Sequence, residues 1–148
     1  MQVHVPAGDR RVDRPSWVWL AIILEILTGL LAVPVGLAFL ADPTGSSVGL
    51  PAGWIESTPF GSYTVPGLYL LLMNGFGMLV VAGLSVLRHW TAPWLTGVLG
   101  VGLIAWIAVE VVVMPETMVL TWVFLAVGFV MGFVALFWLR ESRQLQLW

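Results

Sequence analysis

Four long apolar segments, separated by stretches that carry most of the charged residues, dominate the pattern of the chain. They span residues 17–40, 66–87, 93–113 and 118–139. Each is long enough for a helix to cross a bilayer, which takes about 20 apolar residues for roughly 30 Å of hydrocarbon. The apolar positions are continuous and do not alternate, which argues against the strands of a membrane barrel. The pattern therefore predicts an all-α fold, an integral-membrane four-helix bundle in which residues 1–148 form a single transmembrane domain.

The stretches between the last three segments are short. Residues 88–92 separate the second segment from the third, and residues 114–117 separate the third from the fourth. Short connections force neighbouring helices to pack antiparallel. We therefore expect the helices to run alternately up and down.

The arginines indicate how this bundle is oriented in the membrane. All of them fall in stretches that four alternating spans place on one side, namely Arg10, Arg11, Arg14, Arg88, Arg140 and Arg143. The stretches on the other side carry acidic residues and no basic one. Cytoplasmic loops are rich in Arg and Lys. We therefore expect a multi-pass protein of the inner (plasma) membrane with both termini in the cytoplasm.

The connection over residues 41–65, on the outer side in this arrangement, is longer than the others. Loops of that length are usually functional or disordered. This one carries Trp54, Phe60 and Tyr63, which a disordered loop would not need. Two interpretations remain open. Either the loop is ordered and caps the outer mouth of the bundle with these aromatic side chains, or the side chains adhere to lipid headgroups.

Composition excludes several classes of protein. Apolar residues make up 59% of the chain and charged residues 9%, against about 25% charged in a soluble domain, so a soluble enzyme and a disordered chain are excluded. Six Arg, no Lys and a net charge of −2 provide no basic patch for nucleic acid. The chain has no Cys, and both His lie outside the apolar segments. We therefore expect a non-enzymatic protein of the lipid bilayer, without a metal or other cofactor.

Tryptophans gather near the predicted membrane boundaries, where an indole ring is half buried and its N–H stays hydrated. Those near the inner boundary are Trp17, Trp19, Trp90, Trp94, Trp138 and Trp148, and those near the outer one are Trp54 and Trp122. We interpret these as anchors. Trp106 is different, because it lies deep in the third segment.

Strongly polar side chains inside the segments are the candidate site residues, because a charged group near the bilayer centre costs about 2.5–3.5 kcal/mol. At 1.5 Å per residue, Glu25 lies roughly 12 Å from the inner boundary, Asn74 roughly 12 Å from the outer one, and Glu110 roughly 5 Å inside the outer one. Three further polar residues, at similar depths or on the same helix face, complete the candidate set: Tyr69, Thr121 and Thr28.

Two interpretations of Glu25, Asn74 and Glu110 remain open. In the first, each carboxyl is uncharged in its apolar surroundings and hydrogen-bonds a neighbouring helix, which fixes register. In the second, the side chains line a polar cavity beneath the long loop and bind a cation, a proton or a small polar molecule, because intramembrane carboxylates are functional candidates by default. Pro34 in the first helix frees a backbone carbonyl, which favours a cavity.

Small residues recur on the predicted helix faces. In the fourth segment Gly128 and Gly132 form a GxxxG pattern. Small side chains let helix backbones approach closely, and close approach drives association in lipid. The pair predicts close packing either inside one bundle, which we favour, or in a homodimer or larger membrane complex.

The sequence around the long loop carries a resemblance. Its motifs are DPTG at 42–45, TPFGSY at 58–63 and PGL at 66–68, followed by Gly75 and preceded by Glu25 and Gly29 in the first helix. Over roughly residues 25–77 the chain resembles a segment that recurs in small bacterial four-helix inner-membrane proteins of uncharacterised function. The resemblance implies a four-helix inner-membrane protein and no particular activity.

Three functional hypotheses fit these features. The first is a membrane protein whose carboxylate-bearing pocket binds or passes a cation, a proton or a small polar molecule, and a transporter of this size would dimerise. The second is an accessory subunit of a larger membrane complex, with Gly128 and Gly132 on its contact face. The third is an enzyme or carrier that binds a lipid or quinone, with Glu25 as an acid–base group.

Overall fold

The computed structural model describes residues 11–114 and 116–144, and their regular structure is helical. Four helices are long and apolar enough to cross a membrane: Ser16–Ala41, Thr64–Val86, Ala92–Val113 and Val119–Ser142. The prediction of an all-helical chain with four such helices is confirmed. Two residues invoked for orientation and anchoring, Arg10 and Trp148, lie outside the described residues.

The first and second spans are each built from more than one element. A 3₁₀ turn, η2 (Ser16–Val18), leads into α1 (Trp19–Ala41). The second span consists of α3 (Thr64–Tyr69), the π-helix η4 (Leu70–Gly77) and α4 (Met78–Val86). The third and fourth are the single helices α5 (Ala92–Val113) and α6 (Val119–Gln144). The last of these continues beyond the predicted end at residue 139.

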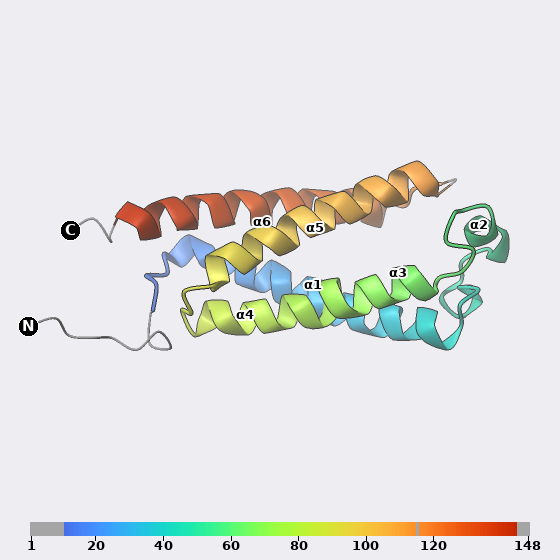
Figure 1. Ribbon diagram of the computed structural model, residues 1–148, viewed down its shortest axis with the longest axis horizontal. Helices are drawn as coiled ribbons and strands as arrows, with labels where there is room; N and C mark the ends of the chain where they lie inside the picture. The colour runs from blue at the N-terminus through green and yellow to red at the C-terminus, as the bar shows by residue number, and fades with distance from the viewer. Residues whose placement is uncertain (1–10, 115, 145–148) are drawn as a thin grey trace, which may run out of the picture.

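The helices form two hairpins, each held together by close backbone contact at glycines. In the first, α1 packs along α3, η4 and α4, and a Cβ added to Gly36 would lie 3.0 Å from the carbonyl oxygen of Gly67. In the second, α5 packs along α6, and a Cβ added to Gly100 would lie 3.0 Å from the carbonyl oxygen of Gly128. Figure 1 shows the α5–α6 pair diverging from the α1–α3 pair towards the end that carries α2 (Ala52–Glu56).

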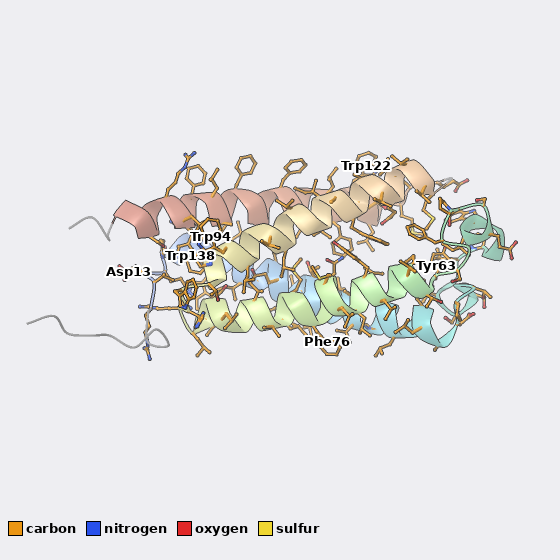
Figure 2. The ribbon with its side chains drawn as sticks, in the orientation of Figure 1. Asp13, Tyr63, Phe76, Trp94, Trp122 and Trp138 are labelled. Atoms are coloured by element: carbon orange, nitrogen blue, oxygen red, sulfur yellow. The ribbon has the colours of Figure 1, made fainter. Side chains whose placement is uncertain are left out.

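The opposite end, where α1 begins and α6 ends, holds the two hairpins together. We call it the arginine end, because it carries Arg11, Arg14, Arg88 and Arg140. The indole Nε1 of Trp138 donates a hydrogen bond to the carbonyl oxygen of Asp13 at 2.8 Å (Figure 2). Within the first hairpin, Arg14 Nη1 donates to the carbonyl oxygen of Val86 at 3.0 Å and ties the segment before α1 to the end of α4. The hairpins are therefore joined here and separate towards the other end.

A residue in the left-handed backbone conformation makes the tight turn between α4 and α5 possible. Arg88 has φ 57°, and it follows the last turn of α4. The N–H of His89 bonds to the carbonyl oxygen of Leu84, and that of Arg88 bonds to Ser85. This is the Schellman arrangement that ends many helices, in which glycine usually occupies the left-handed position.

The connection between α1 and α3, residues 42–63, forms the loop end of the molecule (Figure 1). It contains a 3₁₀ turn, η3 (Ser46–Val48), and α2 (Ala52–Glu56). Asp42 holds its first turn, because the carboxylate accepts hydrogen bonds from Thr44, Ser46 and Ser47. The bond from Ser46, followed by those from its neighbours, holds the pKa of Asp42 well below its ordinary value. The last turn is fixed by Tyr63, whose ring stacks on Phe39 of α1 with centroids 4.6 Å apart.

Candidate functional site

A cavity of about 450 Å³ lies at the loop end, between the two separating hairpins. Its walls come from α1, from the start of the second span and from the facing ends of α5 and α6, and the 42–63 loop contributes Val48, Leu50, Trp54, Phe60 and Tyr63. Small-molecule sites typically occupy about 300–1,000 Å³ and are mostly apolar with a few placed polar groups. The size and position of this cavity make it the candidate functional site.

Most of the cavity lining is apolar, and much of it is aromatic. The aromatic lining residues are Phe39, Trp54, Phe60, Tyr63, Trp106 and Phe124. They come from α1, the loop, α5 and α6. The predicted loop residues Trp54, Phe60 and Tyr63 thus face the cavity, together with Trp106, which the sequence distinguished by its depth. Neither Phe39 nor Phe124 was a candidate, because one Phe among many apolar residues carries no signal of its own.

The polar lining is acidic or neutral. It consists of Thr28, Tyr63, Asn74, Glu110, Glu116 and Thr121. No Arg side chain is among the lining residues of the described chain, and the sequence has no Lys. The field inside the cavity therefore favours a positive charge over a negative one.

Glu110 and Thr121 form a pair across the α5–α6 hairpin. Thr121 Oγ1 donates a hydrogen bond of 2.7 Å to Glu110 Oε1. Tyr63 lies close enough for its titration to respond to this carboxylate. Burial raises the pKa of the Tyr63 hydroxyl, and the negative charge of Glu110 raises it further. The buried hydroxyl therefore keeps its proton, and it has no hydrogen-bond partner among the described residues.

Asn74 lies in the π-helix, and its side chain reaches the cavity from the second span. The residue is 2% exposed. Its amide makes no hydrogen bond to the part of the chain that the structure describes. π-helical turns are frequent at functional sites. The geometry thus places an amide donor and acceptor at the cavity.

Glu25 is separate from this cavity. It is fully buried, and Thr96 Oγ1 of α5 donates a 2.6 Å hydrogen bond to its Oε1. Its Oε2 has no hydrogen-bond partner among the described residues. Thr28, one turn further along α1, lines the cavity, whereas Glu25 does not. The structure therefore brings Asn74 and Glu110 to one site and places Glu25 in a contact between the hairpins. Thr96 was not among the candidate residues.

Tyr69 also lies outside the lining. Its hydroxyl donates a 2.8 Å hydrogen bond to the carbonyl oxygen of Gly102 in α5. Its ring stacks on Trp106, with centroids 4.5 Å apart. Tyr69 thus supports the cavity wall from behind Trp106.

The two glycines of the GxxxG pattern have different surroundings. A Cβ added to Gly128 would lie 2.8 Å from Cγ1 of Ile104 and 3.1 Å from the carbonyl oxygen of Gly100. A Cβ added to Gly132 would meet no described atom within 4 Å. Gly128 therefore permits close packing within the chain, between α6 and α5.

Comparisons with known proteins identify no relative of this chain. No protein-family model matches the chain, no curated protein matches its sequence, and no solved structure matches its fold. Among the described residues, no three His, Cys, Asp or Glu side chains are grouped so that they could hold a metal ion. The cavity itself is therefore the feature that points to a function.

Proposed function

We propose that this is a non-enzymatic, multi-pass membrane protein that binds an organic cation with a largely apolar body, such as a hydrophobic amine or quaternary ammonium compound. The observation that carries the proposal is the carboxyl group of Glu110 in an aromatic cavity whose lining, over the described residues, includes no basic side chain. The orientation that we propose puts the arginine end in the cytoplasm of a bacterial cell and the cavity in the outer half of the inner membrane.

Electrostatics supports a positively charged ligand. An ionised carboxylate and a cation about 4 Å apart attract each other by about 4 kcal/mol at an effective dielectric constant of 20. Glu110 and Glu116 supply the negative charge, and none of the lining residues opposes it. Aromatic faces also attract cations, by about 0.5–2 kcal/mol each depending on desolvation. Acidic and aromatic groups therefore favour the same class of ligand.

The apolar walls distinguish an organic cation from a bare ion. Calcium takes 6–8 oxygen ligands and magnesium needs six, whereas here a few polar groups are spread over a cavity lined mostly by hydrocarbon. A ligand with a hydrophobic body buries that surface, at roughly 25 cal/mol per Å². Polar atoms of the ligand can bond to the Tyr63 hydroxyl, which lacks a partner among the described residues, and to the Asn74 amide, which lines the cavity.

Binding of tetraphenylphosphonium, a compact hydrophobic cation, tests the proposal. With purified protein in nanodiscs of neutral lipid, we expect saturable binding by equilibrium dialysis. The variant Glu110→Gln should weaken it about tenfold or more, because an ion–carboxylate attraction is lost. The control is Glu56→Gln, which makes the same change of charge at an exposed loop residue that does not line the cavity.

Tetraphenylborate provides the second control, because it has nearly the same shape and the opposite charge. We expect it to bind no more tightly to the protein than to empty nanodiscs. Equal binding of both ions, or equal effects of the two Gln variants, would show that the cavity does not select cations. Either result would overturn the proposal.

A further inference from the structure

The cavity is bounded by four seams, the lines along which two helices pack, and three of them are closed. The seam between α1 and the second span is closed by backbone contact. A Cβ added to Gly36 would lie 2.9 Å from the backbone nitrogen of Leu71, and one added to Gly67 would lie 2.8 Å from Cβ of Phe39. No side chain can pass between backbones packed this closely.

The seams on either side of α5 are closed by hydrogen bonds and ring contacts. Thr121 bonds to Glu110 across the α5–α6 seam. Tyr69 bonds to Gly102 across the seam between the second span and α5, and its ring stacks on Trp106. The Trp106 ring in turn lies 6.4 Å from that of Phe60 in the loop. The loop and this pair of rings thus cover the cavity on the side of the second span.

The fourth seam, between α1 and α6, has none of these contacts. Among the described residues, no hydrogen bond or ring contact joins α1 to α6. The side chains that line the cavity here also face outward: Leu31 of α1 is 55% exposed, and Leu120 of α6 is 54% exposed. Both lie within spans long and apolar enough to cross a membrane. The cavity therefore reaches the part of the surface that faces hydrocarbon.

We infer that the ligand is a long-chain cationic amphiphile, whose charged head lies at Glu110 and whose alkyl chain leaves the cavity through the α1–α6 seam into the bilayer. This inference rests on the proposed function and specifies its ligand. An apolar seam open to lipid accommodates a chain longer than the cavity, because the part of the chain that does not fit inside can remain among the lipid tails, which are as apolar as the side chains of the seam.

The charges of the site decide between a cationic amphiphile and a phospholipid. A phospholipid that used the same seam would place its phosphate beside Glu110 and Glu116, with no basic side chain among the lining residues to neutralise it. A quaternary ammonium head is attracted by both carboxylates and by the faces of the surrounding rings. The site therefore favours a head that carries a positive charge alone.

A substitution that fills the seam tests the inference. We compare Leu31→Trp with Leu30→Trp. Leu30 is the adjacent residue on α1, is 59% exposed and does not line the cavity. The probes are hexadecyltrimethylammonium and tetraphenylphosphonium. Their affinities are measured in nanodiscs by the displacement of radiolabelled tetraphenylphosphonium. Each affinity is expressed relative to the concentration of the probe in the membrane. Both positions face outward, so both variants should fold, which thermal unfolding checks.

We expect Leu31→Trp to weaken the binding of hexadecyltrimethylammonium about tenfold, which corresponds to 1.4 kcal/mol. The reason is that the Trp side chain occupies the place of the alkyl chain in the seam. Because Leu31 also lines the cavity, the control is the difference between the probes: the loss of affinity for tetraphenylphosphonium, which has no chain, should be at least about fivefold smaller than the loss for hexadecyltrimethylammonium on the same scale. Leu30→Trp should change neither. If the two variants affect the long-chain probe equally while tetraphenylphosphonium still binds and depends on Glu110, the seam is not used and the proposed function stands. If tetraphenylphosphonium does not bind at all, the proposed function and this inference both fail.

Discussion

The contact between Thr96 and Glu25 is the clearest polar contact between the two hairpins. A carboxyl oxygen buried in an apolar interior costs free energy unless it accepts a hydrogen bond, and Thr96 Oγ1 supplies that bond to Oε1 at 2.6 Å. Ser85 shows the opposite situation. Its buried hydroxyl has no hydrogen-bond partner among the described residues. The two hydroxyls therefore allow a matched comparison.

We predict that Thr96→Val destabilises the protein by about 1–2 kcal/mol, because it leaves Glu25 Oε1 buried without a donor. Ser85→Ala removes a hydroxyl that satisfies no other described group, so its effect should be close to zero. Unfolding in detergent micelles, followed by circular dichroism during titration with sodium dodecyl sulfate, measures both. Equal losses for the two variants would mean that the Thr96 hydrogen bond adds nothing beyond the burial of a hydroxyl.

At the level of residues, the sequence predicted which polar side chains lie inside the spans, but it did not predict which residues they contact. Glu25, Asn74 and Glu110 are conspicuous because polar residues inside apolar spans are rare and costly. Glu25 and Glu110 were expected to share a cavity, but the structure separates them. Pairing depends on how the helices are rotated and spaced, and a single sequence does not specify this. Thr96 carries no signal, since a lone Thr in a membrane helix is common.

At the level of elements, the GxxxG pattern shows what a motif can and cannot specify. It predicted close helix packing in α6, and the structure places Gly128 against α5. The open surroundings of Gly132 could not be predicted, because both glycines look alike in the sequence. The bounds of the first three spans were predicted to within two residues of those observed. The π-helix in the second span was not predicted, since its backbone bonding depends on tertiary packing.

The two glycines provide a prediction within one motif. Gly128→Ala should destabilise the protein by about 1–3 kcal/mol, because the new Cβ would lie 3.1 Å from the carbonyl oxygen of Gly100, which cannot move without its helix. Gly132→Ala should be neutral or stabilise by up to about 1 kcal/mol, the difference in helix propensity, since the Cβ enters open space.

The same detergent titration measures both glycine variants, and analytical ultracentrifugation of each records the oligomeric state. If Gly128→Ala dissociated an oligomer without lowering the stability of the monomer, the motif would act between chains. An accessory-subunit or dimer role for this face would then gain support. Greater destabilisation by Gly132→Ala would contradict the packing described here.

At the level of the whole molecule, the fold is a pair of hairpins that are joined at the arginine end and, towards the loop end, stay joined between the second span and α5 through Tyr69. Asp13 and Trp138 join them at the arginine end, and Glu25 with Thr96 joins them further in. Beyond that point the α5–α6 pair diverges from the α1–α3 pair (Figure 1), and the cavity lies in the space between them. The position of the cavity follows from the distribution of these contacts, since among the residues that the structure describes no hydrogen bond or ring contact joins α1 to α6 at the loop end.

The direction in which this asymmetric bundle is inserted decides which face of the membrane supplies its ligand. The arginines favour a cytoplasmic arginine end, so a green fluorescent protein fused after residue 148 should fluoresce, and alkaline phosphatase at the same site should be inactive. Alkaline phosphatase inserted after Gly53, where an added Cβ would meet no described atom within 4 Å, should be active. Fluorescent protein, which does not mature after export in an unfolded state, should be dark there.

The reverse pattern at both sites would place the cavity in the cytoplasmic half of the membrane, and its ligand would then come from the inner leaflet. Activity of alkaline phosphatase at one terminus but not the other would contradict the even number of spans, because an even number returns the chain to the side from which it started.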